Sequence, residues 1–105
     1  MRKIKVKKWK AVNPDGSEKE ESLITALTVL VSNSRVIPKG IEKFRTFARI
    51  SAAFDKSAST GVLELEEAEY ELLKKIVEDN IPSYWALNNN ISEAIEEFLK
   101  AEEVK

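Results

Sequence analysis

The segment IEKFRTFARISAAFDK, at residues 41–56, spaces its hydrophobic side chains as an amphipathic helix does. At about 100° per residue, the apolar arc consists of Phe44, Phe47, Ser51 and Phe54, edged by Ile41, Ala48 and Ile50. Arg45 and Arg49 fall on the opposite side. A fully buried phenylalanine contributes roughly 1.5–3 kcal/mol, so three of them constrain a short chain strongly. We expect this helix to be the centre of the core, with a partner contact along part of the arc as the alternative.

The chain has 105 residues, 43% hydrophobic and 33% charged, which predicts one globular domain over residues 1–105. No run approaches the roughly 18 consecutive apolar residues of a membrane helix, and residues 1–10 lack the apolar core of a signal peptide. We therefore predict no membrane contact and a cytoplasmic location. Glu and Lys dominate the charges, Gln is absent and Met occurs only at position 1, a composition typical of thermophilic proteins.

The chain contains neither cysteine nor histidine, which excludes disulfides, thiolate zinc sites and a histidine general base. Paired carboxylates can support hydrolysis or hold a hard metal. The densest group comprises Glu64, Glu66, Glu67, Glu69 and Glu71. These residues surround a strand end and a helix start, point in several directions and accompany no phosphate-binding or nucleophile motif. We predict no enzymatic activity, no cofactor, no metal site and no small-molecule substrate.

The first third of the chain predicts a strand, a turn and a helix. Residues 2–12 alternate Lys with apolar side chains and break step near Lys8, as an irregular strand does. The sequence NPDG at residues 13–16 is a strong turn signal. Ser17 and Glu20 have the spacing of a capping box, so we expect a helix over residues 19–32. The β-branched content of residues 23–31 leaves a buried strand as the alternative there.

The remaining pattern predicts a loop at 33–40, a small-residue linker at 57–61, a strand at 61–66, helices at 66–79 and 91–103, and a connection at 83–87. Asn90 or Ser92 is the expected cap of the last helix. The strand at 61–66 should pair with the region of Ile4 and Val6, because a lone strand leaves its backbone groups unpaired. The predicted fold class is α+β, mostly helical, with about four helices and a small two-stranded antiparallel sheet, in the order β-α-α-β-α-α.

Six of the first ten residues are basic and none is acidic. A basic stretch with an interleaved aromatic such as Trp9 can bind phosphates and stack bases. The candidate nucleic-acid contacts are Arg2, Lys3, Lys5, Lys7, Lys8, Arg45 and Arg49. Lysines also protect edge strands from aggregation. We expect weak, sequence-independent binding to nucleic acid at most, and this function is not the favoured one.

The two parts of the chain carry opposite charge. Residues 1–56 hold thirteen basic and six acidic side chains, whereas residues 57–105 hold four basic and twelve acidic ones. Such halves can pair within one molecule, or one copy can present its positive face to the negative face of another. The acidic half also repels phosphate, which weakens the nucleic-acid hypothesis.

The segment IPSYWALNNN, at residues 81–90, combines two large aromatic side chains with a polar tract. Tyr and Trp are enriched at binding hot spots, although they also close cores beneath loops. Both placements of Tyr84 and Trp85 stay open from sequence. Together with Trp9 they are the candidate interaction residues.

Residues 39–79, KGIEKFRTFARISAAFDKSASTGVLELEEAEYELLKKIVED, resemble small proteins encoded in phage and prophage clusters. The shared pattern is an amphipathic helix, a short linker, an L-x-L strand and a helix rich in Glu and Tyr. The resemblance implies a small accessory or structural component of a virus-derived system that works as an oligomer. We therefore predict a non-enzymatic interaction or assembly protein, whose partner is itself or another protein. A nucleic-acid-binding accessory protein is the alternative.

Overall fold

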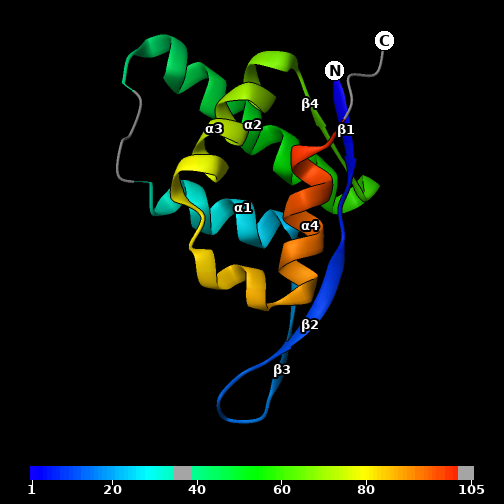
Figure 1. The fold of residues 1–105 in the computed structure, drawn as a ribbon. Coiled ribbons are helices and arrows are strands. Elements are labelled where there is room, and N and C mark those ends of the chain that lie inside the picture. Colours follow the sequence, from blue (N-terminus) through cyan, green and yellow to red (C-terminus); the bar gives the residue numbers. More distant parts are fainter. Residues whose placement is uncertain (35–38, 102–105) are drawn as a thin grey trace.

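The computed structural model describes residues 1–34 and 39–101, and it confirms the α+β class with four α-helices (Figure 1). Two antiparallel two-stranded sheets accompany them. The elements in chain order are β1 (Arg2–Lys5), β2 (Lys8–Val12), β3 (Glu18–Ser22), α1 (Leu23–Ser32), α2 (Ile41–Thr60), β4 (Val62–Leu65), α3 (Glu67–Asn80), the 3₁₀ helix η1 (Ser83–Leu87) and α4 (Asn89–Leu99). The part of the predicted 33–40 loop at 35–38 lies outside the described residues.

The predicted pairing of the first strand with the strand after the central helix is confirmed. Strand β1 runs antiparallel to β4, with Ile4 opposite Leu63. The alternation along these strands buries Ile4, Leu63 and Leu65 at 4% exposure or less, as expected of a sheet with one dry face. The Val6 amide extends the ladder by donating to the Gly61 carbonyl at 3.0 Å.

The second sheet corrects the prediction for residues 19–22, which form a strand and not the first turn of a helix. After the break at Val6 and Lys7, β2 pairs with β3 across the predicted turn, and Trp9 lies opposite Glu21. Lysines of β2 form ion pairs with glutamates of β3, Lys8 with Glu20 and Lys10 with Glu18, each at 3.7 Å. Such pairs favour the hairpin over a helix.

Helix α1 therefore begins at Leu23, and the capping box predicted at Ser17 and Glu20 is wrong. The hydroxyl of Ser22 and the side chain of Thr25 form the capping box instead. Residues 23–31 are helical and not a buried strand, and they bury Leu23, Ala26, Leu27 and Leu30. The β-branched side chains are mostly on the outer faces, where helix packing tolerates them.

The central helix α2 lies on the core with a different face from the one predicted. Its buried residues are Thr46, Ile50 and Ser57, while Phe47 and Phe54 are half-buried. Phe44 is 68% exposed. The helix also continues through the predicted linker to Thr60, and Gly61 ends it with a φ of 75°, a conformation that glycine adopts without strain. Because β4 follows at once, this tight turn decides which side of α2 meets the sheet.

Helices α3 and α4 each bury the apolar face that helical spacing gives them. Tyr70, Leu73, Ile76 and Val77 are buried on α3, and Ala94, Ile95 and Phe98 are buried on α4. The predicted caps of the last helix are wrong, because the Asn88 side chain accepts the Asn90 and Ile91 amides. Helix α4 ends at Leu99, and positions 102–103 of the predicted helix lie outside the described residues.

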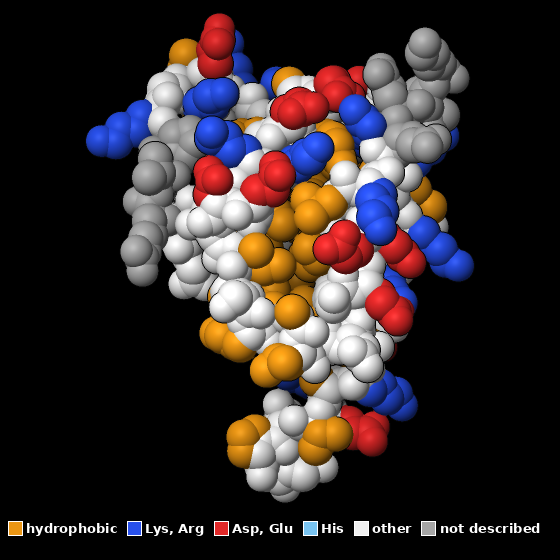
Figure 2. Space-filling view, viewed as in Figure 1, with side chains coloured by type: hydrophobic (Ala, Val, Ile, Leu, Met, Phe, Trp, Pro, Cys, Tyr) orange, Lys and Arg blue, Asp and Glu red, His pale blue; other side chains and the backbone are white. Residues whose placement is uncertain are grey.

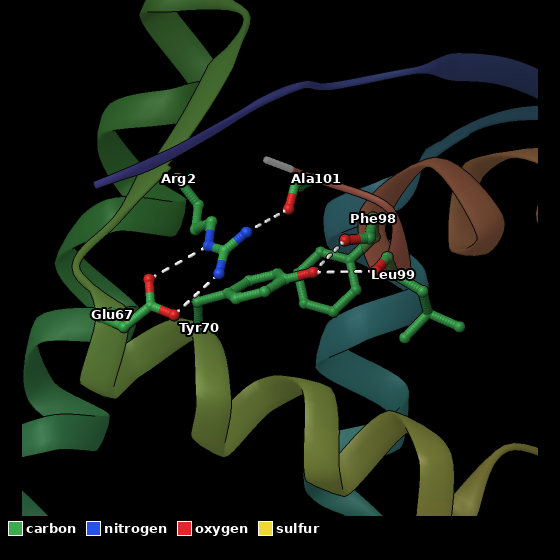
Figure 3. Close-up of polar contacts among 6 residues, drawn as sticks. All are labelled: Arg2, Glu67, Tyr70, Phe98, Leu99 and Ala101. Atoms are coloured by element: carbon green, nitrogen blue, oxygen red, sulfur yellow. Dashed lines mark hydrogen bonds and ion pairs between the residues drawn. The ribbon is translucent and has the colours of Figure 1, made fainter. Parts of the chain in front are cut away.

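A cluster around Tyr70 ties the two ends of the chain together (Figure 3). The Tyr70 hydroxyl donates to the Phe98 carbonyl at 2.7 Å and to the Leu99 carbonyl at 3.1 Å, which satisfies the C-terminal turn of α4. The Arg2 guanidinium lies 4.7 Å from the Tyr70 ring centroid and forms two hydrogen bonds with Glu67. It also donates to the Ala101 carbonyl. Burial raises the pKa of Tyr70.

The Arg2–Glu67 pair makes stability depend on acid pH. The hydrogen bond from Arg2 lowers the pKa of Glu67 below its ordinary 4.5. A depressed folded-state pKa contributes stability above the unfolded pKa that is lost as the pH falls through the folded pKa. In chemical denaturation series from pH 7 to pH 2.5, we expect the stability gap between the parent and Glu67→Gln to shrink below pH 4.5. The stability gap between the parent and Arg2→Gln should shrink in the same pH range. A gap that stays constant with pH would contradict this account.

Candidate functional site

The 3₁₀ helix η1 settles the positions of the two candidate aromatic residues. Pro82 precedes it, and the Trp85 amide donates to the Pro82 carbonyl at 3.0 Å, which closes the first turn. Tyr84 lies on the surface at 68% exposure, whereas Trp85 is half-buried and packs against the core. Leu87, at the end of the same turn, is 87% exposed. The two aromatics thus divide between surface and core edge.

Trp85 borders a groove between η1 and α4. The groove has a volume of 140 Å³, and its apolar lining consists of Ile81, Pro82, Trp85, Ala86, Ile91 and Ile95. The polar side chains at its edge are Ser83, Ser92 and Glu96. A second hollow, of 60 Å³, shares Trp85 and Ile91 with the groove and reaches Trp9 and Val29. We call η1 and the groove together the Trp85 surface.

The Trp85 surface is part of a larger apolar strip (Figure 2). Hydrophobic side chains gather in a hollow that runs between α3 and α4 down to η1, and charged side chains border its upper part on both sides. Exposed apolar side chains gathered in a hollow with a charged rim are typical of protein interaction sites. Within η1 itself, the sequence SYWAL carries no charge.

Trp9, the third candidate interaction residue, is a core residue. It is 8% exposed, and its indole nitrogen donates to a Glu21 carboxylate oxygen at 3.2 Å. A nucleobase would need an open ring face for stacking. In this position Trp9 offers little surface for that contact.

Most of the predicted nucleic-acid contacts are engaged in ion pairs. Among the residues that the structure describes, acidic partners lie within 4.0 Å of Arg2, Lys3, Lys7, Lys8 and Arg49. Lys5 and Arg45 are exposed and form no ion pair within the described part of the chain. The seven basic side chains are therefore distributed over several elements, and most of them are paired with a nearby carboxylate.

The oppositely charged halves of the sequence pair within one molecule. Among the described residues, five ion pairs join the first half (1–34 and 39–56) to the second (57–101): Arg2–Glu67, Lys3–Glu64, Lys7–Glu93, Arg49–Glu69 and Lys56–Glu64. Exposed ion pairs contribute little each. Their main effect here is that part of the charge asymmetry between the two halves is neutralised within one molecule.

The clustered carboxylates serve the fold. Glu69 is 5% exposed and belongs to the capping box at the start of α3, and Glu64 lies between Lys3 and Lys56. Residues 1–34 and 39–101 contain no group of three or more acidic side chains placed to hold a metal ion. The same residues include no helix with the length and apolarity to cross a membrane.

The exposed face of α2 contradicts the favoured prediction of a fully buried arc, for which a partner contact along part of the arc was the alternative. Ile41 and Phe44 are 60% and 68% exposed, although both were assigned to a buried arc. The signal was present in the unusual width of that arc, because an apolar stripe wider than the core contact must continue into solvent.

Comparison with family models, with curated proteins and with solved structures finds no match to this chain.

Proposed function

We propose that this chain is a non-enzymatic interaction protein that self-associates through the Trp85 surface. The observation that carries the proposal is the exposure of Tyr84 and Leu87 beside an apolar groove that Trp85 lines. Aromatic side chains in desolvated pockets contribute most of the energy at protein interfaces. The resemblance to oligomeric phage accessory proteins agrees with the same proposal.

Apolar burial is the driving force in this proposal. Several cations of the first half already form ion pairs with the second half of the same molecule, so fewer charges remain for contacts between molecules. Hydrophobic association depends weakly on salt, whereas ion-pair association weakens as salt rises. The proposed assembly should therefore persist at 0.5 M salt.

Nucleic-acid binding has less support than self-association. Only Lys5 and Arg45, of the seven candidate contacts, lack an ion pair within the described residues, and nonspecific affinity rises with the number of phosphates neutralised. Nanomolar affinity for DNA or RNA at physiological salt would reverse this ranking.

The test removes an exposed leucine that supports the interface and not the fold. Leu87→Ser should raise the dissociation constant about tenfold or more, because burying a leucine side chain contributes roughly 1.5–3 kcal/mol. Sedimentation velocity over a concentration series measures this change. Since Leu87 is 87% exposed in the isolated chain, the melting temperature should stay close to that of the parent.

Val12→Ser is the matched control. Val12 is 71% exposed at the end of β2, so the substitution removes a similar apolar side chain from a different surface. Association of the control should equal that of the parent. Equal weakening by both substitutions would mean that general hydrophobicity, and not the Trp85 surface, drives association.

A further inference from the structure

Helix α2 carries a second apolar surface, far from the first. Residues 41, 44, 48 and 52 share one face at about 100° per residue, and all four side chains, Ile41, Phe44, Ala48 and Ala52, are exposed. The start of α2 lies at the upper left of Figure 1, while η1 crosses the lower part. One molecule therefore cannot place its own Phe44 in its own groove.

The two surfaces differ in the charge around them. Helix α2 carries four basic and two acidic side chains, and the exposed Arg45 follows Phe44 directly. Helix α4 carries three acidic side chains and no basic one, and Glu96 lies at the edge of the groove. Glu93 and Glu96 form exposed ion pairs with Lys7 and Lys100, so the acidic charge of α4 is only partly neutralised. A basic apolar surface and an acidic apolar surface on one chain are complementary to each other.

We propose that the exposed face of α2 docks on the Trp85 surface of a second copy, with Phe44 inserted in the groove. This inference rests on the proposed self-association and specifies its geometry. The groove measures 140 Å³, close to the cavity of about 150 Å³ that holds a benzene molecule in an engineered protein. Phe44 is exposed in the first turn of α2, and its phenyl ring has the size of a benzene molecule.

The small residues of α2 let the helix approach the second copy closely. Ala48 and Ala52 follow Phe44 on the same face, so the helix backbone can lie near α4 once the phenyl ring is seated. The ring then contacts the Trp85 indole, and aromatic pairs prefer edge-to-face or offset contacts. Arg45 reaches the acidic side of α4 from the same turn.

The contact joins two different surfaces and is therefore heterologous. Each copy carries one Phe44 side chain and one groove, so the contact can repeat from copy to copy. The result is a closed ring or an open linear chain. A symmetric contact of α2 with α2 would instead bring together the basic side chains Arg45 and Arg49 of both copies. Charge repulsion disfavours that arrangement.

The absence of native cysteine allows a direct test by disulfide crosslinking. Ala48→Cys and Ala86→Cys are small changes at exposed positions, one on α2 and one at the groove. The two proteins are mixed, one of them labelled with ¹⁵N, and oxidised under mild conditions. Mass spectrometry then separates the mixed dimer from the two symmetric dimers. Glu42→Cys, on another face of α2, replaces Ala48→Cys in the control mixture.

The heterologous contact predicts that the mixed dimer forms about tenfold faster than in the control mixture, since docking raises the effective concentration of the two thiols. Phe44→Ser should in turn raise the dissociation constant about tenfold or more. Symmetric dimers through residue 86 or residue 48 would overturn the α2 contact while self-association stands. A parent protein that is monomeric at every concentration would overturn both the contact and the proposed function.

Discussion

Replacing Phe98 with alanine is expected to lower the free energy of unfolding by about 3–5 kcal/mol. Phe98 is fully buried, and its ring meets that of Tyr70 edge-to-face, with centroids 5.2 Å apart. Its carbonyl accepts the Tyr70 hydroxyl, so the residue joins α3 to the last turn of α4. Truncation removes this packing and leaves a cavity among fully buried neighbours. Urea denaturation followed by circular dichroism measures the loss.

Phe44→Ala is the matched control, because it truncates the same side chain on the surface. Its effect should stay within about 0.5 kcal/mol, as for most surface substitutions. Phe47, which the sequence placed at the centre of the core, is only half-buried, so its truncation should cost less than that of Phe98. A larger loss for Phe44→Ala than for Phe98→Ala would mean that the core is assigned wrongly.

Replacing Trp9 with alanine is expected to cost about 3–5 kcal/mol as well. Trp9 is the buried side chain through which the β2–β3 hairpin joins the core, and it lines the small hollow with Ala26, Val29 and Trp85. The hydrogen bond to Glu21 would be lost with the ring. Without Trp9 the hairpin retains mainly exposed ion pairs, which contribute little. Hydrogen exchange of the hairpin amides should therefore accelerate together with the loss of stability.

Trp9→Phe separates packing from recognition. It keeps a six-membered aromatic ring and loses the five-membered ring with the N–H that donates to Glu21, so part of the stability should return. If Trp9 were a surface contact for a partner, Trp9→Ala would leave stability unchanged. That outcome would place the hairpin differently from the structure.

The elements predicted correctly were those whose residue pattern fits one structure better than any other. The strand at 62–65 alternates strictly and needs a partner, so its pairing with β1 could be predicted. The faces of α3 and α4 followed from helical spacing alone. The β2–β3 hairpin could not be predicted, because the charged sequence EKEE at residues 18–21 fits a helix start and an edge strand equally well. The buried Trp9 opposite Glu21 decided between them.

The candidate site was predictable in part. An uncharged SYWAL segment after a proline already pointed to Tyr84 and Trp85, but sequence could not separate a surface ring from a half-buried one. For α2, exposure of part of the apolar arc was only the alternative to burial, and the arc is nearly half the circumference wide. Such an arc does not say which half meets the core, and the tight turn at Gly61 determines that choice through β4. Neighbouring elements, and not local pattern, placed Phe44 in solvent.

The most direct test of the central claim compares the two tryptophan indole N–H signals by NMR as the protein is diluted. The chain has only two tryptophans, one buried in the core and one beside the groove. We expect the Trp85 signal to shift with concentration, together with amides of η1 and α4, while the Trp9 signal stays fixed. A spectrum in which neither indole moves up to millimolar concentration, or in which Trp9 moves and Trp85 does not, would contradict self-association through the Trp85 surface.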